Sequence, residues 1–232
     1  MKAFLLAAGL GTRLRPITDT TPKCLIPIDG RPMVDIWMDA LAEIGVEEVL
    51  INLHHLAPLV RAHLARRTAP HILISEEPVL LGSAGTLLAN RDFVVDEEMF
   101  LVVNADNLTN FDLGVLVEAH RQGGAIATLS VFRAARPSEC GIVEVRDGGV
   151  VGFVEKPPVP RSDLANAGIY AFHPSVIDLI PPPAPRDIGF DLIPRLVGRA
   201  RAVSIGASYF IDIGTPAALE RARNDWGALH TS

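Results

Sequence analysis

The stretch LLAAGLGTRLRPITDTTPKCLIP, residues 5–27, decides which fold we expect this chain to adopt. It continues an apolar run over residues 2–8, which is short enough to be a strand buried on both faces. Gly9 and Gly11 follow the run, and glycine lets a backbone bend sharply and come close to a ligand. The N–H groups that such a turn exposes form an anion-binding loop.

Three cations lie on or after this turn, at Arg13, Arg15 and Lys23, although the whole chain has a net charge of −6. Only three of the 21 cationic side chains are lysines, so Lys23 and Lys156 indicate positions that require a compact ammonium group. A plain turn with surface arginines is the alternative interpretation. The gathered charge instead favours a ligand that is more acidic than the protein.

Two common phosphate-binding motifs do not fit this loop. A P-loop has Lys and then Ser or Thr after its second glycine, whereas Thr12 follows Gly11 here. The dinucleotide fingerprint requires a third glycine, and Leu14 occupies that position. The sequence therefore disfavours a dinucleotide-dependent oxidoreductase.

Composition places the chain among ordinary globular proteins. With 232 residues, 49% of them hydrophobic, it can bury a full core. The acidic balance and the lack of a long apolar run predict no nucleic-acid partner and no membrane association. The two cysteines do not form a disulfide framework, and the first residues do not resemble a signal peptide. We therefore expect a cytoplasmic protein.

Apolar patterns alternate between strand and helix in the first half of the chain. They predict helices over residues 31–45, 56–67 and 80–90, and strands over 2–8, 47–53, 71–77 and 98–107. Shorter strand patterns follow a helix at 113–122; they cover residues 125–132, 141–145, 149–157 and 165–172. Short helices are expected near 174–179 and 190–197, and a strand, turn and helix over 209–226. This order predicts an α/β fold: a Rossmann-like, mostly parallel sheet flanked by helices, with a β-rich subdomain in a single domain of residues 1–232.

Ligands of such sheets bind beyond the carboxyl ends of the strands. Residues 9–23, 82–85 and 104–107 all lie at such ends, so we expect them to face one crevice. Asp106 and Asp212 each follow a strand, where a carboxylate can cap a turn or hold a hard cation. Two of them beside a phosphate loop favour a shared Mg²⁺ site.

Polar residues also interrupt the strands of the second half. Glu155 and Lys156 end a strand before a proline, and neighbouring strand residues point in opposite directions. One of them is therefore expected to reach a pocket while the other braces it, although a solvated charge pair would look the same. Asn166 and Gly168 in an apolar strand indicate an amide and a close backbone approach beside a hydroxylated ligand.

Together these motifs resemble the sugar-1-phosphate nucleotidyltransferases over nearly the whole chain. The family's opening Gly-x-Gly-Thr-Arg-Leu, with later Pro, Thr and Pro-Lys, is matched by residues 9–23, and its Leu-Gly-(Thr/Ser)-Ala-Gly loop by residues 81–85. The remaining family motifs are Glu-Lys-Pro at 155–157, Asn-x-Gly at 166–168, Asp-x-Gly-Thr at 212–215 and a metal Asp at Asp106, preceded by Ala105 rather than glycine. The chain most resembles the short, single-domain mannose- and heptose-1-phosphate guanylyltransferases.

The resemblance implies a role for each motif residue, with residues 1–110 as the nucleotide-binding half and 111–232 as the sugar-phosphate half. The implied catalytic residues are Arg13, Lys23 and Lys156. The implied nucleotide-binding residues are Leu6, Ala7, Ala8, Gly9, Gly11, Thr12, Arg13, Lys23, Glu76, Gly82, Ser83, Ala84, Asn104 and Asp106. The implied sugar-phosphate residues are Asn107, Gly141, Glu155, Lys156, Asn166 and Gly168. The implied metal is Mg²⁺, on Asp106 and Asp212.

The implied reaction joins an NTP to a sugar 1-phosphate and releases pyrophosphate. GTP and a manno-configured sugar are the expected substrates, with uridylyl or thymidylyl transfer to another sugar phosphate as the alternative. A non-catalytic regulatory subunit is a second alternative, which the intact motif residues disfavour. A homodimer is compatible with the resemblance.

Overall fold

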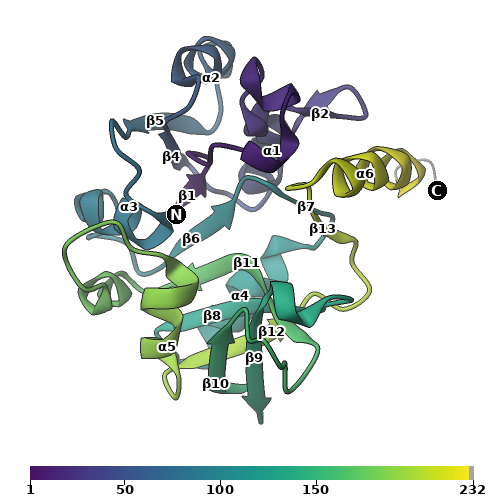
Figure 1. Cartoon of the computed structure of the whole chain (residues 1–232). Helices are drawn as coiled ribbons and strands as arrows, with labels where there is room; N and C mark the ends of the chain where they lie inside the picture. The colour runs from purple at the N-terminus through teal and green to yellow at the C-terminus, as the bar shows by residue number, and fades with distance from the viewer. Residues whose placement is uncertain (230–232) are drawn as a thin grey trace.

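The computed structural model describes residues 1–229; residues 230–232, which the predicted single domain includes, lie outside the described residues. Its centre is a nine-stranded sheet with the order β5-β4-β1-β6-β11-β8-β12-β10-β9 (Figure 1). The strands of this sheet are β1 (Lys2–Leu6), β4 (Glu48–Leu53), β5 (His71–Glu76), β6 (Phe100–Asn104), β8 (Ala127–Arg133), β9 (Gly141–Arg146), β10 (Gly149–Glu155), β11 (Leu164–Phe172) and β12 (Ala200–Ser204). Two small two-stranded sheets pair β2 (Pro27–Ile28) with β3 (Arg31–Pro32) and β7 (Asn107–Thr109) with β13 (Phe210–Asp212).

The predicted parallel sheet occupies the N-terminal half. β1 pairs in parallel with β4 on one side and with β6 on the other, and β4 pairs in parallel with β5. Parallel strands in register bring the ends of β1, β4, β5 and β6 to one edge. The motifs that follow these strands therefore meet at that edge, as expected.

The β-rich second half continues the same sheet. β11 pairs antiparallel with β6, and β8 pairs antiparallel with β11 and parallel with β12. The α/β fold with helices around a central sheet is therefore confirmed, while strict parallel pairing is found mainly in the first half.

Helices cover both faces of the sheet because alternate strand residues point to opposite sides. The helices are α1 (Met33–Glu43), α2 (Ala57–Leu64), α3 (Ser83–Ala89), α4 (Leu113–Gly123), α5 (Ile193–Leu196) and α6 (Pro216–Leu229). Ala3 and Leu5 of β1 pack in one cluster with α1, α2, α4 and α6. Phe4 lies in a second cluster with α3 and α5. No helix within residues 1–229 is long and apolar enough to cross a bilayer.

The sequence patterns missed a few short elements. β12 is half exposed and carries Arg201, which masks the apolar alternation of a strand. The expected helix over residues 190–197 is a π-helical turn, Ile188–Leu192, followed by the single turn α5. Asp187 begins the π turn because its side chain accepts hydrogen bonds from the N–H groups of Gly189 and Phe190.

One buried histidine makes stability depend on pH. His120 of α4 packs against β8, where its Nδ1 lies 3.0 Å from Thr128 Oγ1. Burial, and then the charge of His173, lowers the pKa of His120 below its ordinary value of 6.5. As the pH falls through 6.5, the unfolded chain takes up a proton that the folded chain resists, so folded-state stability is lost below that pH.

We predict that wild type loses more unfolding free energy than His120→Gln between pH 7 and pH 5. The difference approaches about 1.4 kcal/mol per pH unit until the folded state protonates. Urea denaturation at each pH measures it, with His71→Gln, at an exposed histidine, as the matched control. Parallel pH profiles for wild type and His120→Gln would contradict the prediction.

Candidate functional site

The glycine loop leaves β1 and is held in one conformation by its own side chains. Gly11 has φ +62°, and a Cβ atom there would lie 2.8 Å from Thr18 Cγ2. Thr18 Oγ1 donates to the carbonyl of Gly11 at 2.8 Å. The Ala7 N–H, at the start of the loop, donates to Asn52 Oδ1 at 2.7 Å. The backbone conformation of Gly11 and its contact with Thr18 therefore require glycine at position 11.

Lys23 connects the glycine loop to two carboxylates. Its Nζ lies 2.6 Å from Asp106 Oδ2 and 3.5 Å from Asp212 Oδ1, and only 11% of the side chain is exposed. Arg15, by contrast, pairs with Asp19 at 3.2 Å on the surface. Of the three cations expected at the loop, Arg15 therefore lies outside the site.

The two carboxylates come from neighbouring strand ends. The N–H of Ile213 donates to the carbonyl of Asp106, and Asp212 Oδ1 accepts from the N–H of Gly214 at 2.7 Å. Half of the Asp212 side-chain surface is exposed to solvent, but nearby protein atoms still exclude much of the water around the carboxylate. This desolvation, and then the charge of Asp106, raises the pKa of Asp212, while Lys23 and Arg13 oppose the rise.

A pair of carboxylates with this environment suits a small divalent cation. Mg²⁺ is usually held by one or two carboxylates, with water and substrate phosphates completing its shell. Within residues 1–229 no cluster of three or more His, Cys, Asp or Glu side chains could hold a metal alone. Asp106 and Asp212 therefore fit a metal that a phosphate ligand also binds, rather than a structural metal.

The second glycine loop, residues 81–85, is clasped by a segment from the other half of the chain. The carbonyl of Arg186 accepts from the N–H groups of Ala84 and Gly85, and its own N–H donates to the carbonyl of Leu81. Gly82 has φ +77°, and a Cβ atom there would lie 2.3 Å from the Arg186 oxygen. The clasp therefore leaves no room for a side chain at Gly82.

A cavity of about 380 Å³ opens between this clasp and the first glycine loop. It is lined by Leu6, Ala8, Gly9, Asn52, Glu77, Leu80, Gly82, Ser83, Asn104, Asp106 and Asp187. Glu77, not the predicted Glu76, provides a carboxylate to this cavity. Glu76 ends β5 with its side chain exposed and pairs with Arg61.

Glu77 is buried behind the wall of this cavity and connects the segments that form it. It is 3% exposed and accepts hydrogen bonds from Asn52 Nδ2, Thr86 Oγ1 and the N–H of Leu81. Because Asn52 also accepts from the N–H of Ala7, a chain of hydrogen bonds with a buried centre at Glu77 joins the two glycine loops. Fully satisfied buried networks of this kind make a site rigid.

Glu155 ends β10 and Lys156 follows it outside the strand, with its ammonium 3.8 Å from Glu155 Oε1. The Glu155 carboxylate is 14% exposed and lies where Cβ atoms on Gly141 or Gly189 would collide with it. Burial raises the pKa of Glu155, Lys156 lowers it, and Asp187 raises it further. Lys156 has φ +47° and lines a cavity that Arg13 and Asp212 also line.

Other predicted sugar-side residues form hydrogen bonds within the protein. Asn107 Nδ2 donates to the Ala167 carbonyl. Asn166 Nδ2 donates to the Tyr170 hydroxyl, and its Oδ1 accepts from the N–H of Gly168. These contacts fix the irregularity in β11 at Gly168, where φ is +71°.

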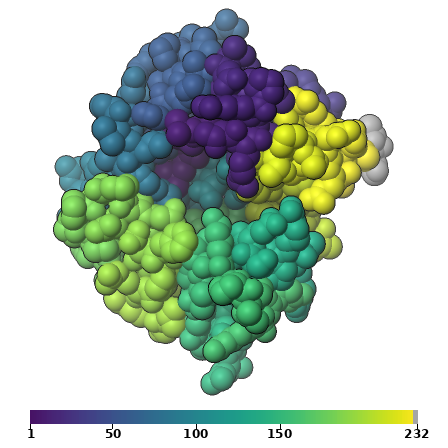
Figure 2. All heavy atoms as spheres, viewed as in Figure 1, coloured from purple at the N-terminus to yellow at the C-terminus, as the bar shows by residue number. Residues whose placement is uncertain are grey.

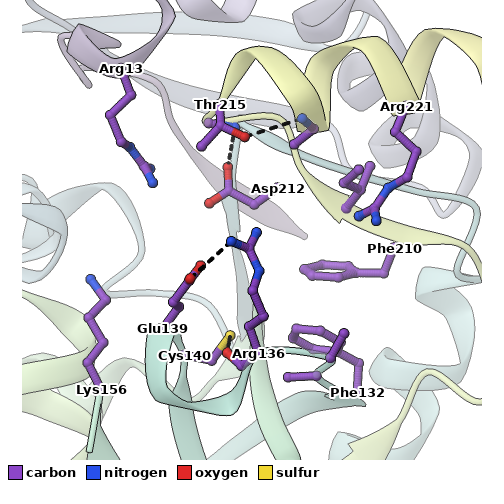
Figure 3. A pocket seen from close by; sticks show the side chains of 15 residues that line it. Arg13, Phe132, Arg136, Glu139, Cys140, Lys156, Phe210, Asp212, Thr215 and Arg221 are labelled. Atoms are coloured by element: carbon purple, nitrogen blue, oxygen red, sulfur yellow. Dashed lines mark hydrogen bonds and ion pairs between the residues drawn. The ribbon is translucent and has the colours of Figure 1, made fainter. Parts of the chain in front are cut away.

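The glycine loops and carboxylates line adjoining cavities. One of about 320 Å³ is lined by Gly9, Leu10, Gly11, Thr12, Arg13, Lys23, Leu80, Asp106 and Gly214, and a smaller one includes Ala7. Another, of about 250 Å³, includes Arg13, Asp212 and Lys156 (Figure 3). Figure 2 shows the hollow between the purple and blue N-terminal half and the green half. Ala84 is buried in the clasp instead.

Sequence reasoning missed several residues of this cleft. Asn52 is a polar residue within an apolar strand pattern, and this interruption could have indicated a residue of the site. Asp187 lines the 380 Å³ cavity and accepts a hydrogen bond from Ser83 Oγ. Arg136 and Arg221 line the 250 Å³ cavity, and no motif marks them.

Comparisons with known proteins show which sequences and structures this chain resembles. The chain is 33% identical over 222 residues to the mannose-1-phosphate guanylyltransferase catalytic subunit beta of Dictyostelium discoideum, covering 93% of this chain and 62% of that protein. It is 38% identical over 214 residues to the UTP–glucose-1-phosphate uridylyltransferase of Synechocystis sp., covering 85% of this chain and 55% of that protein. The chain thus spans little more than half the length of these relatives.

A similar fold is found in the solved structure of HddC from Yersinia pseudotuberculosis. Its TM-score is 0.81 at 24% identity, with 97% of this chain and 99% of that chain covered. The Nucleotidyl transferase family profile matches residues 2–227, nearly the whole chain. The chain therefore belongs to the Nucleotidyl transferase family.

Proposed function

We propose that this protein transfers a nucleotidyl group from an NTP to a sugar 1-phosphate, giving an NDP-sugar and pyrophosphate. The observation that carries the proposal is the contact of Lys23 with both Asp106 and Asp212 beside the glycine loop. It brings a phosphate-binding turn, a cation and a carboxylate pair to one point. Relatives named for guanylyl and uridylyl transfer support the same reaction class.

The residues suit a reaction that requires positioning and charge neutralisation. An oxygen of the sugar phosphate forms a bond to the α-phosphorus, the bond from that phosphorus to the β-bridging oxygen breaks, and its electron pair leaves with pyrophosphate. The attacking phosphate has a second pKa of about 6 and is already anionic at pH 7. No general base is therefore required, and cations that stabilise the transferring phosphoryl group are the main need.

In this proposal the glycine loop, Arg13 and Lys23 bind the triphosphate. Members of the family generally depend on a divalent metal, and Asp106 and Asp212 would hold Mg²⁺. When bound, Mg²⁺ neutralises charge on the phosphate oxygens. Lys156, which lines a cavity together with Asp212, binds the sugar phosphate. A cytoplasmic location and a homodimer remain predictions.

GTP and a manno-configured sugar are the proposed substrates, mannose 1-phosphate or D-glycero-D-manno-heptose 1-phosphate. The 380 Å³ cavity supports a purine because Gly82 and Ser83 leave it wide. Guanine N1–H and N2–H₂ require acceptors, and Glu77 and Asp187 are the carboxylates that line this cavity in addition to the metal ligand Asp106. Glu155, partly desolvated between two glycines, is the proposed partner of a sugar hydroxyl.

Removing one of the carboxylates should abolish most activity without unfolding the chain. We expect Asp106→Asn to lower turnover about 10²-fold or more, because one metal ligand and one negative charge are lost. Steady-state rates at saturating Mg²⁺ measure this. The matched control is Asp178→Asn, at an exposed aspartate that pairs with Arg91. Near-wild-type turnover of Asp106→Asn would disprove the metal assignment.

Substitutions of the two motif lysines should each raise the KM for a different substrate. We expect Lys23→Ala to raise the KM for the NTP, and Lys156→Ala the KM for the sugar phosphate, by about 10- to 100-fold each, since each loses a charge-assisted contact. Lys2→Ala is the control, because the Lys2 ammonium binds the Phe93 carbonyl away from the cleft. The same substrate affected in both variants would contradict this division.

A substrate panel tests the base and the sugar. We expect GTP to exceed the other three common NTPs, and manno-configured sugar 1-phosphates to exceed glucose 1-phosphate, in kcat/KM from pyrophosphate release. A site that hydrogen-bonds a base edge discriminates strongly, because the wrong base leaves buried polar groups unpaired. A strong preference for UTP or dTTP would overturn the guanylyl proposal, and no pyrophosphate release from any NTP would overturn the transferase proposal.

A further inference from the structure

The turn between β4 and α2, residues 54–56, lies between the two glycine loops. β4 is placed between β1 and β5 in the sheet and pairs in parallel with both. The first glycine loop follows β1, and the segment that contains Glu77 and the second glycine loop follows β5. Because parallel strands end at the same edge, residues that follow β4 are within reach of both segments.

Two consecutive histidines of this turn contact the two segments separately. His55 Nε2 lies 2.8 Å from the carbonyl oxygen of Thr18, and His54 Nδ1 lies 2.7 Å from the carbonyl oxygen of Glu77. A carbonyl oxygen can only accept a hydrogen bond, so each of these ring nitrogens carries a proton and donates it. The two rings therefore use different nitrogens, each for one segment of the cleft.

His55 acts on the first glycine loop through Thr18. The Thr18 side chain is 1% exposed, and its hydroxyl donates to the carbonyl of Gly11 at 2.8 Å. The φ of +62° at Gly11 places the space for a Cβ atom against the Thr18 methyl group. His55 is therefore one residue removed from the turn that is proposed to bind the triphosphate.

His54 acts on the proposed base cavity through Glu77. The Glu77 carboxylate accepts from the N–H of Leu81, and Glu77 lines the 380 Å³ cavity. Because His54 binds the backbone of the same residue, both the main chain and the side chain of Glu77 are held. A shift of this main chain would move the carboxylate that is proposed to meet the base.

Neither histidine lines the cleft itself. Within the described part of the chain, His54 and His55 are absent from the linings of the 380 Å³ and 320 Å³ cavities. Both side chains are partly buried. Losing the donor of such a hydrogen bond leaves an acceptor with less access to water, which costs more than losing a bond at the open surface.

We propose that His54 and His55 are positioning residues with separate effects on the NTP. His55 sets the first glycine loop for the triphosphate of any NTP, and His54 sets Glu77 for discrimination between bases. The proposal rests on the proposed nucleotidyl transfer and assigns to one short turn two parts of NTP recognition that can be altered independently.

Amide substitutions test each hydrogen bond separately. A glutamine amide nitrogen takes about the position of a histidine Nε2, and an asparagine amide nitrogen that of Nδ1. His55→Gln therefore keeps the donor to Thr18, and His55→Asn loses it. For the bond to Glu77 the pair is reversed, since His54→Asn keeps the donor and His54→Gln loses it.

Steady-state kinetics provide the first measurement. We expect His55→Asn to raise the KM for all four NTPs by about 10-fold and to leave the KM for the sugar phosphate within about twofold of wild type. His54→Gln should lower the ratio of kcat/KM between the preferred NTP and the other three by about 10-fold, because the Glu77 carboxylate is displaced. His55→Gln and His54→Asn should resemble wild type, as should His71→Gln, at an exposed histidine beside Glu48.

Amide hydrogen exchange of the free chain provides the second measurement and requires no turnover. Exchange should become faster at residues 9–19 in His55→Asn and at residues 77–86 in His54→Gln, because local opening becomes easier where a bond is lost. Thermal unfolding of each variant checks that the fold is kept.

Equal effects within an amide pair, or wild-type exchange in both His55→Asn and His54→Gln, would overturn the proposal. An equal rise in the KM for the sugar phosphate would assign the histidines a general structural role and would overturn it as well. If the wild-type chain releases no pyrophosphate with any NTP, the transferase proposal fails, while the exchange data still show whether the histidines hold the two segments.

Discussion

The ammonium group of Lys23 holds together the three chain segments on which the cleft depends. It comes from the glycine loop, and it contacts Asp106 after β6 and Asp212 at the end of β13. Without a cation the two carboxylates would repel one another; desolvation first, and then the charge of Asp106, raises the pKa of Asp212. In the proposed function, this edge of the fold binds the metal and the phosphate ligand.

A second constraint couples the two halves of the chain. The backbone of Arg186 clasps the loop around Gly82, and Asp187 accepts a hydrogen bond from Ser83. Asp187 also acts on Glu155, because its charge helps to raise the pKa of that carboxyl. Asp187 thus links the proposed base cavity to Glu155, the proposed sugar partner, so the position of one depends on the packing of the other.

Much of the cleft could be predicted because its motifs follow parallel strands, whose carboxyl ends meet at one edge. This reasoning did not distinguish Glu76 from Glu77. β5 ends at Glu76, and the residue that faces the cavity depends on where the strand ends, which the sequence pattern does not fix to one residue. Asn166 could not be placed from the pattern, because an irregularity in β11 turns its amide toward Tyr170. Arg136 and Arg221 come from segments that only tertiary packing brings together.

The most direct test of the account is a structure of the chain with Mn²⁺ and a nonhydrolysable GTP analogue. The account predicts one ion ligated by Asp106 and Asp212, with the Lys23 ammonium on the triphosphate and the base beside Glu77. An ion bound away from both carboxylates, or Lys23 still bridging them with the nucleotide bound elsewhere, would contradict it.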